Sequence, residues 1–170
     1  TATMTTSSRT EQKKSVVAVV RSTPETVLED VGNVMRLAGY QQALPLSADV
    51  LLKINISWQH WYPACSTSPW QLEGVIKTLR EDGYNNLIGA HNGTVVVDSY
   101  EGEVANKHKT VTDRLEIPTI HLDVEPNKWV AYKPKGEMLL LVKIFPEGIT
   151  IPESFQGKNI IQLPPMKTHV

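Results

Sequence analysis

The residues best suited to chemistry in this sequence are Lys167 and His169, which stand two positions apart near its end. A histidine can accept or donate a proton near neutral pH, and a lysine can hold a carboxylate or a phosphate through its charge. In an extended segment a spacing of two places both side chains on the same side. The pair therefore predicts acid–base chemistry on a small anionic substrate. The alternative is that both are solvated loop residues.

A second candidate is the aromatic segment Trp58-Gln59-His60-Trp61-Tyr62. Three aromatic side chains in one loop are costly to leave in water, so we expect them to cover a ligand, an oligomeric partner or the remainder of the polypeptide. His60 could act as an acid, a base or a metal ligand. A loop that packs on its own domain explains the same residues equally well.

A glycine-containing turn, Gly89-Ala90-His91-Asn92-Gly93-Thr94, is the third candidate. Its backbone N–H groups could bind an anion, although it has neither the dinucleotide-binding nor the P-loop glycine spacing. A plain turn at the end of a strand is the alternative. Elsewhere, Cys65 and His60 do not make a structural zinc site, because such sites need about four ligands in paired short spacings.

These residues are positioned by segments that alternate between strand-like and helix-like patterns. The expected strands are 15–20, 49–56, 86–90, 117–124 and 159–163, and the expected helices run from Pro24 to Gly39, from Pro69 to Gly83 and over 103–115. This alternation predicts an α/β fold, a mainly parallel sheet with helices on both faces, because right-handed crossovers return each helix to the sheet. Ligands of such sheets bind beyond the carboxyl ends of the strands, where four of the five histidines are expected.

Pro/Gly turns change the pattern after residue 128 and predict a small antiparallel β segment around 129–151, with strands at 129–132, 138–145 and 149–151. Residues 1–14 are rich in Thr and Ser without apolar periodicity, so we expect a flexible tail. Residues 15–170 would then form a single α/β domain. We expect this domain to be incomplete at its C-terminus, because the chain stops where its chemistry begins.

Composition excludes some classes of function. With 17 basic and 18 acidic residues the formal net charge is -1, which lacks the positive charge of a general nucleic-acid binder. No apolar run approaches the roughly 20 residues that span a bilayer, so we expect no membrane partner. The single cysteine, Cys65, cannot form an internal disulfide, which fits a reducing compartment and a cytoplasmic location.

Three segments carry a resemblance to a known family: Lys53-Ile54-Asn55, Thr67-Ser68-Pro69 before a helix, and the stretch from Ile160 through Leu163-Pro164-Pro165 to Lys167-Thr168-His169. Over about residues 15–170 the chain resembles the domain of unknown function 362 family. Members show a strand ending in Lys-Pro-Asn, a Thr-x-Pro helix start and a Leu-Pro-x-x-Lys-Thr-His segment. Here Ile54 replaces the proline. The candidate substrate- or cofactor-binding residues are thus Lys53, Asn55, His60, Thr67, His91 and Asn92.

The family is also similar, more distantly, to the lactate racemase family, in which a histidine exchanges a proton of a 2-hydroxy acid beside a nickel-bearing nucleotide. That resemblance implies an acid–base role for His169 and an anchoring role for Lys167. Some family members carry an iron–sulfur domain further along the chain. The sequence does not identify a cofactor, and an iron–sulfur cluster or metal would require a missing C-terminal part, because the chain has no cysteine cluster.

Three functions compete. The first is an enzyme that uses Lys167 and His169 on a small carboxylate substrate. The second is a module that binds a cofactor or partner, associated with an iron–sulfur electron-transfer protein, with the Trp58–Tyr62 loop as its contact surface. The third is a structural domain with solvated histidines. A metal-binding site is a further possibility, because His60, His91, Asp123 and His169 could converge.

Overall fold

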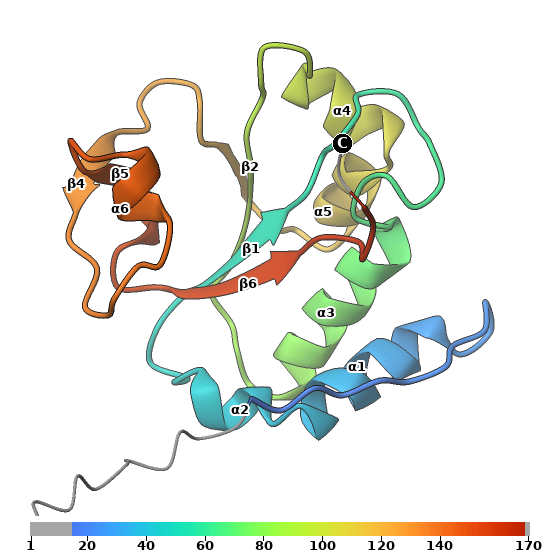
Figure 1. Ribbon diagram of the computed structural model, residues 1–170. Coiled ribbons are helices and arrows are strands. Elements are labelled where there is room, and N and C mark those ends of the chain that lie inside the picture. The colour runs from blue at the N-terminus through green and yellow to red at the C-terminus, as the bar shows by residue number, and fades with distance from the viewer. Residues whose placement is uncertain (1–14, 169–170) are drawn as a thin grey trace, which may run out of the picture.

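A four-stranded parallel sheet forms the centre of the computed structural model, which describes residues 15–168. The predicted tail, residues 1–14, and His169 lie outside the described residues. The strand order is β3-β2-β1-β6 (Figure 1), with β1 at Val50–Ile54, β2 at Leu87–His91, β3 at Thr119–His121 and β6 at Asn159–Leu163. A second, antiparallel sheet pairs β4 (Trp129–Tyr132) with β5 (Ile149–Pro152). The predicted α/β class, with a small antiparallel segment, is confirmed.

Six helices and one short 3-10 helix accompany these strands in the described part of the chain. They are α1 (Val27–Leu37), α2 (Tyr40–Ala43), α3 (Pro69–Glu81), α4 (Ser99–Ala105), α5 (His108–Arg114), α6 (Leu141–Ile144) and η1 (Glu153–Phe155). The main core joins one face of the sheet to α3 and α5, and includes Val50, Leu52, Ile54, Leu72, Val75, Ile76, Leu79 and Val111. The other face carries a smaller cluster of Leu51, Ala90 and Leu122, against which Phe155 packs.

The residues at its two ends explain where helix α3 begins and ends. The Ser68 hydroxyl accepts a hydrogen bond from the Gln71 N–H at 3.2 Å, and Pro69 occupies the first turn, where its missing N–H costs nothing. Past its end, Gly83 has φ +92°, a conformation that glycine adopts without strain. Helix α1 lies against α3, and at the contact a Cβ on Gly74 would stand 2.8 Å from the Cβ of Val31.

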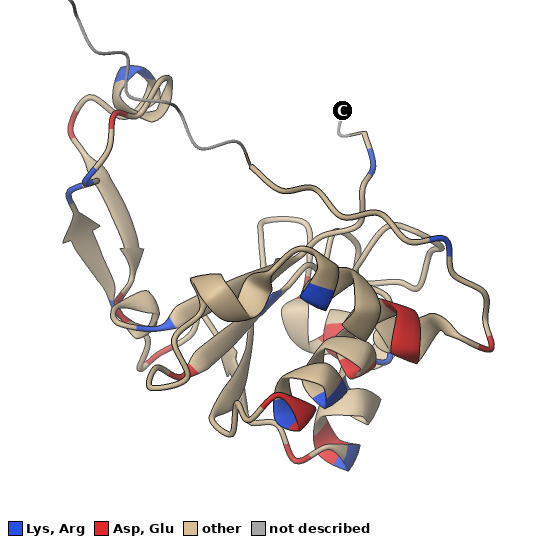
Figure 2. Ribbon diagram, turned by 90° about the horizontal axis from the view of Figure 1, so that it is seen from below, with Lys and Arg blue, Asp and Glu red and all other residues tan. Residues whose placement is uncertain are grey.

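Charged side chains hold the same two helices together at their ends. The Arg36 guanidinium of α1 lies 3.0 Å from both Glu81 Oε2 and Asp82 Oδ1 at the end of α3. Figure 2 shows basic and acidic residues interspersed along the helices. Among residues 15–168, no helix is both long and apolar enough to cross a bilayer.

The helix predicted over 103–115 is two helices. The chain breaks at Asn106 and Lys107, and Lys107 has φ +64°, which a continuous α-helix does not allow. The first half extends further back than predicted, because Asp98 caps α4 by accepting hydrogen bonds from the N–H groups of Tyr100 and Glu101. This capping places Glu103 within α4.

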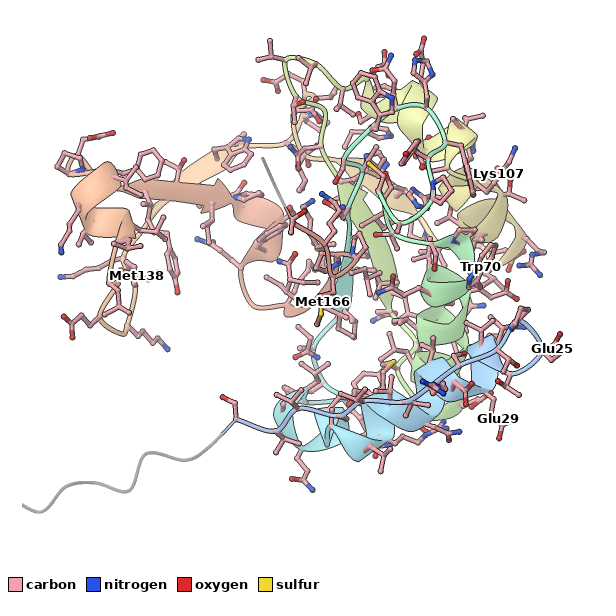
Figure 3. All side chains as sticks on the ribbon, turned by 45° about the vertical axis from the view of Figure 1, so that its right-hand side comes forward. Glu25, Glu29, Trp70, Lys107, Met138 and Met166 are labelled. Atoms are coloured by element: carbon pink, nitrogen blue, oxygen red, sulfur yellow. The ribbon has the colours of Figure 1, made fainter. Side chains whose placement is uncertain are left out.

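Two predicted strands are wrong. Residues 15–20 form no strand, and Val17 and Val19 are 83% and 86% exposed, because an apolar run does not by itself supply a neighbouring strand to pair with. Residues 138–145 contain the short helix α6 instead. Short apolar runs are ambiguous between strand and helix. Figures 1 and 3 show this segment, with Met138, on the far side of the molecule from Trp70 of α3.

Candidate functional site

Two histidines lie side by side at the carboxyl ends of neighbouring strands. His91 ends β2 and His121 ends β3, and the parallel register pairs one with the other. Their ring centroids are 4.3 Å apart with the planes at 76°. Side chains alternate along a strand, so His91 faces the same side as Leu87, which belongs to the main core. Both rings therefore lie on the helix side of the sheet.

Glu103 reaches this histidine pair from α4. Its Oε2 lies 2.9 Å from His91 Nε2 and 3.6 Å from His121 Nε2. The ligand atoms of all three residues lie within 4.8 Å of one another. Glu103 is only 9% exposed and His91 only 1%. We call these three residues the His91–Glu103–His121 cluster.

Burial controls the protonation of His91. The loss of water around the ring lowers the pKa of His91 to about 4, outweighing the hydrogen bond to Glu103, which favours the charged ring, while the neighbouring His121 lowers it further. His91 is accordingly a neutral imidazole at neutral pH. Its Nδ1 is buried without a hydrogen-bond partner among the described residues.

His121 is the more accessible histidine of the cluster, with 12% of its side chain exposed. Its Nδ1 lies 3.1 Å from the Ser99 hydroxyl, the first residue of α4. The Tyr100 ring stacks on the imidazole with centroids 3.8 Å apart, and Tyr100 is half exposed. Helix α4 thus supplies the carboxylate, a hydrogen bond and an aromatic cover.

The aromatic loop holds α4 in place through backbone and side-chain contacts. The Gln59 side chain accepts a hydrogen bond from the Asp98 N–H and donates one to Glu101. Asn106, at the other end of α4, donates to the Trp58 carbonyl at 3.0 Å. The aromatic loop was expected to cover another surface, and in the structure it contacts α4 of its own domain. Trp58, Trp61 and Tyr62 nevertheless remain 43%, 52% and 69% exposed.

Lys167 and His169 are not joined to the cluster in the described structure. Lys167 is exposed, and His169 lies outside the described residues. The segment does follow the carboxyl end of β6, so it leaves the sheet at the same edge as His91 and His121.

Lys53 lies on the opposite face of the sheet from the cluster, since its neighbours Leu52 and Ile54 both face the main core. Its ammonium donates to the Ile54 carbonyl at 3.1 Å. Burial lowers the pKa of Lys53. The structure therefore separates this lysine from the histidines.

Asn55 and Thr67 flank the segment that contains the aromatic loop, and they hydrogen-bond to each other. The Thr67 hydroxyl accepts from the Asn55 N–H at 2.9 Å, and the Thr67 N–H donates to the Asn55 carbonyl at 2.9 Å. The Thr67 carbonyl lies 2.6 Å from Nε2 of the buried His108. These contacts close the loop and connect it to α5.

His60 and Asn92 have local contacts only. His60 is exposed and packs edge-on against Trp58, with centroids 5.7 Å apart. Asn92 donates to the Gly93 carbonyl, and the Gly93 N–H donates to Asp123 rather than remaining free for an anion. Of the four residues that could converge on a metal, His91 alone belongs to the cluster found among residues 15–168.

Sequence reasoning missed Glu103. It placed the residue at the start of a helix, but nothing in the sequence showed that this helix would face the strand ends. The available signal was Asp98, a capping residue five positions earlier, which shifts the helix start and fixes which side chains point inward. His121 was placed near a strand end but was not paired with His91.

A sizeable cavity lies away from the cluster. About 600 Å³ in volume, it is bounded by residues 22–24, Val27, Leu28, Trp70 and Glu73, between the N-terminal segment, α1 and α3 (Figure 3). No cluster residue lines it. We assign the site by the convergence of chemical groups, because this cavity holds only Glu73 as an ionisable group and that carboxylate already pairs with Arg114 and Lys77.

The cluster can act chemically in two ways. A carboxylate beside two imidazoles can move a proton, and the same three groups are donors that transition metals accept.

Comparison with known proteins gives a family but no activity. The family model described as Domain of unknown function (DUF362) matches residues 50–170, starting later than the resemblance predicted from the sequence. No curated protein and no solved structure gives a significant match. Because the family match covers well over half of the chain, this protein belongs to the DUF362 family.

Proposed function

We propose that this chain is an enzyme that exchanges a proton with a small carboxylate substrate at the carboxyl edge of its parallel sheet. The observation that supports the proposal is the position of Glu103, 2.9 Å from His91 and 3.6 Å from His121 at two adjacent strand ends. Three proton-carrying groups in contact, one of them next to solvent, form the arrangement that general acid–base catalysis requires.

The residues of the cluster take different roles in this proposal. His91 is neutral and almost fully buried, so it holds Glu103 rather than meeting a substrate. His121 lies under the half-exposed Tyr100 with 12% of its side chain exposed, so in this proposal its ring or a group held by it contacts the substrate. Lys167 and His169 keep the anchoring and proton-exchanging roles predicted from the sequence, because their segment leaves the same edge of the sheet.

The experiment is proton exchange in D2O. The 170-residue chain is incubated with a panel of small carboxylic acids, and loss of the 1H NMR signal at the carbon next to the carboxylate is followed. We expect exchange to slow by about 100-fold or more in Glu103→Gln, which keeps the shape but not the charge. Glu101→Gln, an exposed glutamate on the same helix, is the matched control. Equal rates in both variants, or no exchange with any acid, would contradict the proposal.

The anchoring role of Lys167 has its own test. Lys167→Ala should raise KM for a carboxylate substrate while kcat changes little, because the lysine would contribute binding rather than proton transfer. His169→Ala should lower kcat instead. An unchanged KM in the first variant removes Lys167 from the site, and an unchanged kcat in the second removes His169.

A second candidate function has one supporting observation, the exposure of Trp58, Trp61 and Tyr62. Exposed aromatic groups of this size are typical of contact surfaces. The alternative is therefore a cofactor- or partner-binding module for a cytoplasmic iron–sulfur electron-transfer protein. Binding to a [4Fe–4S] ferredoxin, measured by calorimetry, should weaken in the Trp58→Ala, Trp61→Ala double variant and persist in Trp129→Ala. Identical heats for all three proteins would exclude this function.

A further inference from the structure

Glu103 is a nearly buried carboxylate without a permanent positive charge beside it. Within residues 15–168, its ion-pair partners are His91 and His121, and no lysine or arginine joins them. The two cations of the next helix have other partners, because Lys109 pairs with Asp113 at 2.8 Å and Arg114 pairs with Glu73. A charge removed from water needs either a partner of opposite charge or a metal ion. The neutral ring of His91 supplies neither.

The distances within the cluster fit a metal ion. Bonds of about 2.0–2.1 Å to nitrogen and oxygen in a tetrahedral arrangement place ligand atoms about 3.3 Å apart. The observed separations from Glu103 Oε2 are 2.9 Å to His91 Nε2 and 3.6 Å to His121 Nε2, one on each side of that value. All three ligand atoms lie within 4.8 Å of one another.

Hydrogen bonding around the cluster also favours ligation. When His121 Nδ1–H donates to the Ser99 hydroxyl at 3.1 Å, its Nε2 presents a lone pair toward Glu103. In this tautomer a cation between the Nε2 lone pair and the carboxylate oxygen, 3.6 Å apart, is attracted to both, whereas in the other tautomer Ser99 donates to Nδ1 and an Nε2–H faces Glu103. A metal-ligating histidine commonly donates its other N–H in this way, which fixes the orientation of its ring.

His91 provides an independent observation. It is 1% exposed, its Nε2 is directed at Glu103, and its Nδ1 has no partner among the described residues. The contact with Glu103 fixes the ring so that Nε2 faces the other two ligand atoms of the cluster. Neutral imidazole is the form that binds metals.

We propose that His91 Nε2, Glu103 Oε2 and His121 Nε2 bind one divalent transition-metal ion of the zinc and cobalt class. Two nitrogens and one carboxylate oxygen suit these borderline ions better than magnesium or calcium, which prefer oxygen ligands alone. Three protein ligands leave a coordination position for water or for a substrate carboxylate. Binding does not depend on turnover, whereas the use of the metal to hold a carboxylate rests on the proposed function above.

The test uses Co2+ as a spectroscopic probe. The full chain is treated with a chelator, dialysed and titrated with CoCl2, and the visible absorption bands of the bound ion are recorded. We expect saturation at one ion per chain, and competition by ZnCl2. Glu103→Gln and His121→Gln should each weaken Co2+ binding by at least about tenfold. Glu101→Gln, an equal loss of charge on the same helix, should bind as the unaltered chain does.

The outcomes separate this proposal from the previous one. Circular dichroism of each variant verifies that the fold is retained, and Glu103→Gln is the main variant because it preserves side-chain volume. Absence of Co2+ bands in the unaltered chain, or equal affinity in Glu103→Gln and Glu101→Gln, would overturn the metal site. Normal Co2+ binding without any proton exchange would leave the metal site intact and reject only the enzymatic function.

Discussion

The hydroxyl of Thr67 donates a hydrogen bond to the carbonyl oxygen of Leu163 at 2.5 Å, joining two residues 96 positions apart. Thr67 immediately precedes the cap of α3, and Leu163 is the last residue of β6. The same hydroxyl accepts from the Asn55 N–H just beyond β1. One buried side chain thus holds together the carboxyl ends of β1 and β6 and the entrance of α3.

Thr67→Val should therefore destabilise the protein by about 1–3 kcal/mol, because it leaves the buried Leu163 carbonyl and the partly buried Asn55 N–H without this partner. Urea unfolding monitored by circular dichroism gives the difference in free energy of unfolding. Thr110→Val is the control, since Thr110 is exposed on α5. Similar losses in the two variants would show that the hydrogen bonds of Thr67 contribute nothing specific.

Gly74→Ala should destabilise the protein even though alanine is the better helix former by about 1 kcal/mol. The added Cβ would lie 2.8 Å from Val31 Cβ, so α1 and α3 would have to move apart. We expect a net loss of about 1–3 kcal/mol from this overpacking. In Gly136→Ala the new methyl group meets no atom within 4 Å, and the thermal midpoint should stay unchanged. A stabilised Gly74→Ala variant would refute the close contact of these helices.

Acid should weaken the fold from about pH 6.5 downward, where the histidines of the unfolded chain begin to bind protons. Burial lowers the pKa of His91 to about 4 and also lowers the pKa of His108. Between pH 6.5 and about 4 the unfolded chain binds protons that the native state excludes, so stability is complete above pH 6.5 and declines as the pH falls. His91 alone accounts for a loss on the order of 3 kcal/mol.

Urea unfolding at several pH values, with a chelator present, measures this dependence. His108→Gln should reduce the slope of stability against pH, because the buried ring whose pKa is lowered is then absent. A stability that stays level from pH 7 to pH 4.5 would show that neither buried ring excludes a proton.

The cap of α4 should affect metal binding as well as stability. Asp98→Ala removes the acceptor for two N–H groups at the start of the seven-residue helix that carries Glu103. We expect a loss of about 0.5–2 kcal/mol in stability and a weaker affinity for Co2+. Ser68→Ala removes the equivalent cap of α3, which carries no cluster residue, and should lower stability alone. If both variants bind Co2+ with equal affinity, the cap of α4 does not contribute to metal binding by the cluster.

Much of the fold followed from the sequence because its signals are local. Thr67-Ser68-Pro69 and Gly83 predicted the limits of α3, and the apolar runs at 49–56, 86–90 and 159–163 contain strands of the observed parallel sheet. Residues 15–20 and 138–145 show where this fails. Their apolar runs carry no information about which neighbour they would contact, and that neighbour decides the conformation.

The site was less predictable because its parts come together only through the sheet. The placement of His91 beside a strand end was correct, since it follows from strand boundaries alone. Its pairing with His121 depends on β2 and β3 being neighbours with that register, and the approach of Glu103 depends on the cap at Asp98. Residue types and spacing predict neither the order of the strands nor the rotation of α4 about its axis.

Backbone pairing fixes how far apart His91 and His121 can move. Their α-carbons belong to consecutive strands of one ladder, so their separation can change only if inter-strand hydrogen bonds break. Glu103 stands on a separate short helix, whose contacts with the aromatic loop are a few polar ones from Gln59 at its start and from Asn106 at its end. When an ion or a molecule binds to the cluster, the backbone adjustment must therefore come from a shift of α4. A partner that binds to the Trp58–Tyr62 loop would change the position of the Glu103 carboxylate before that of either histidine.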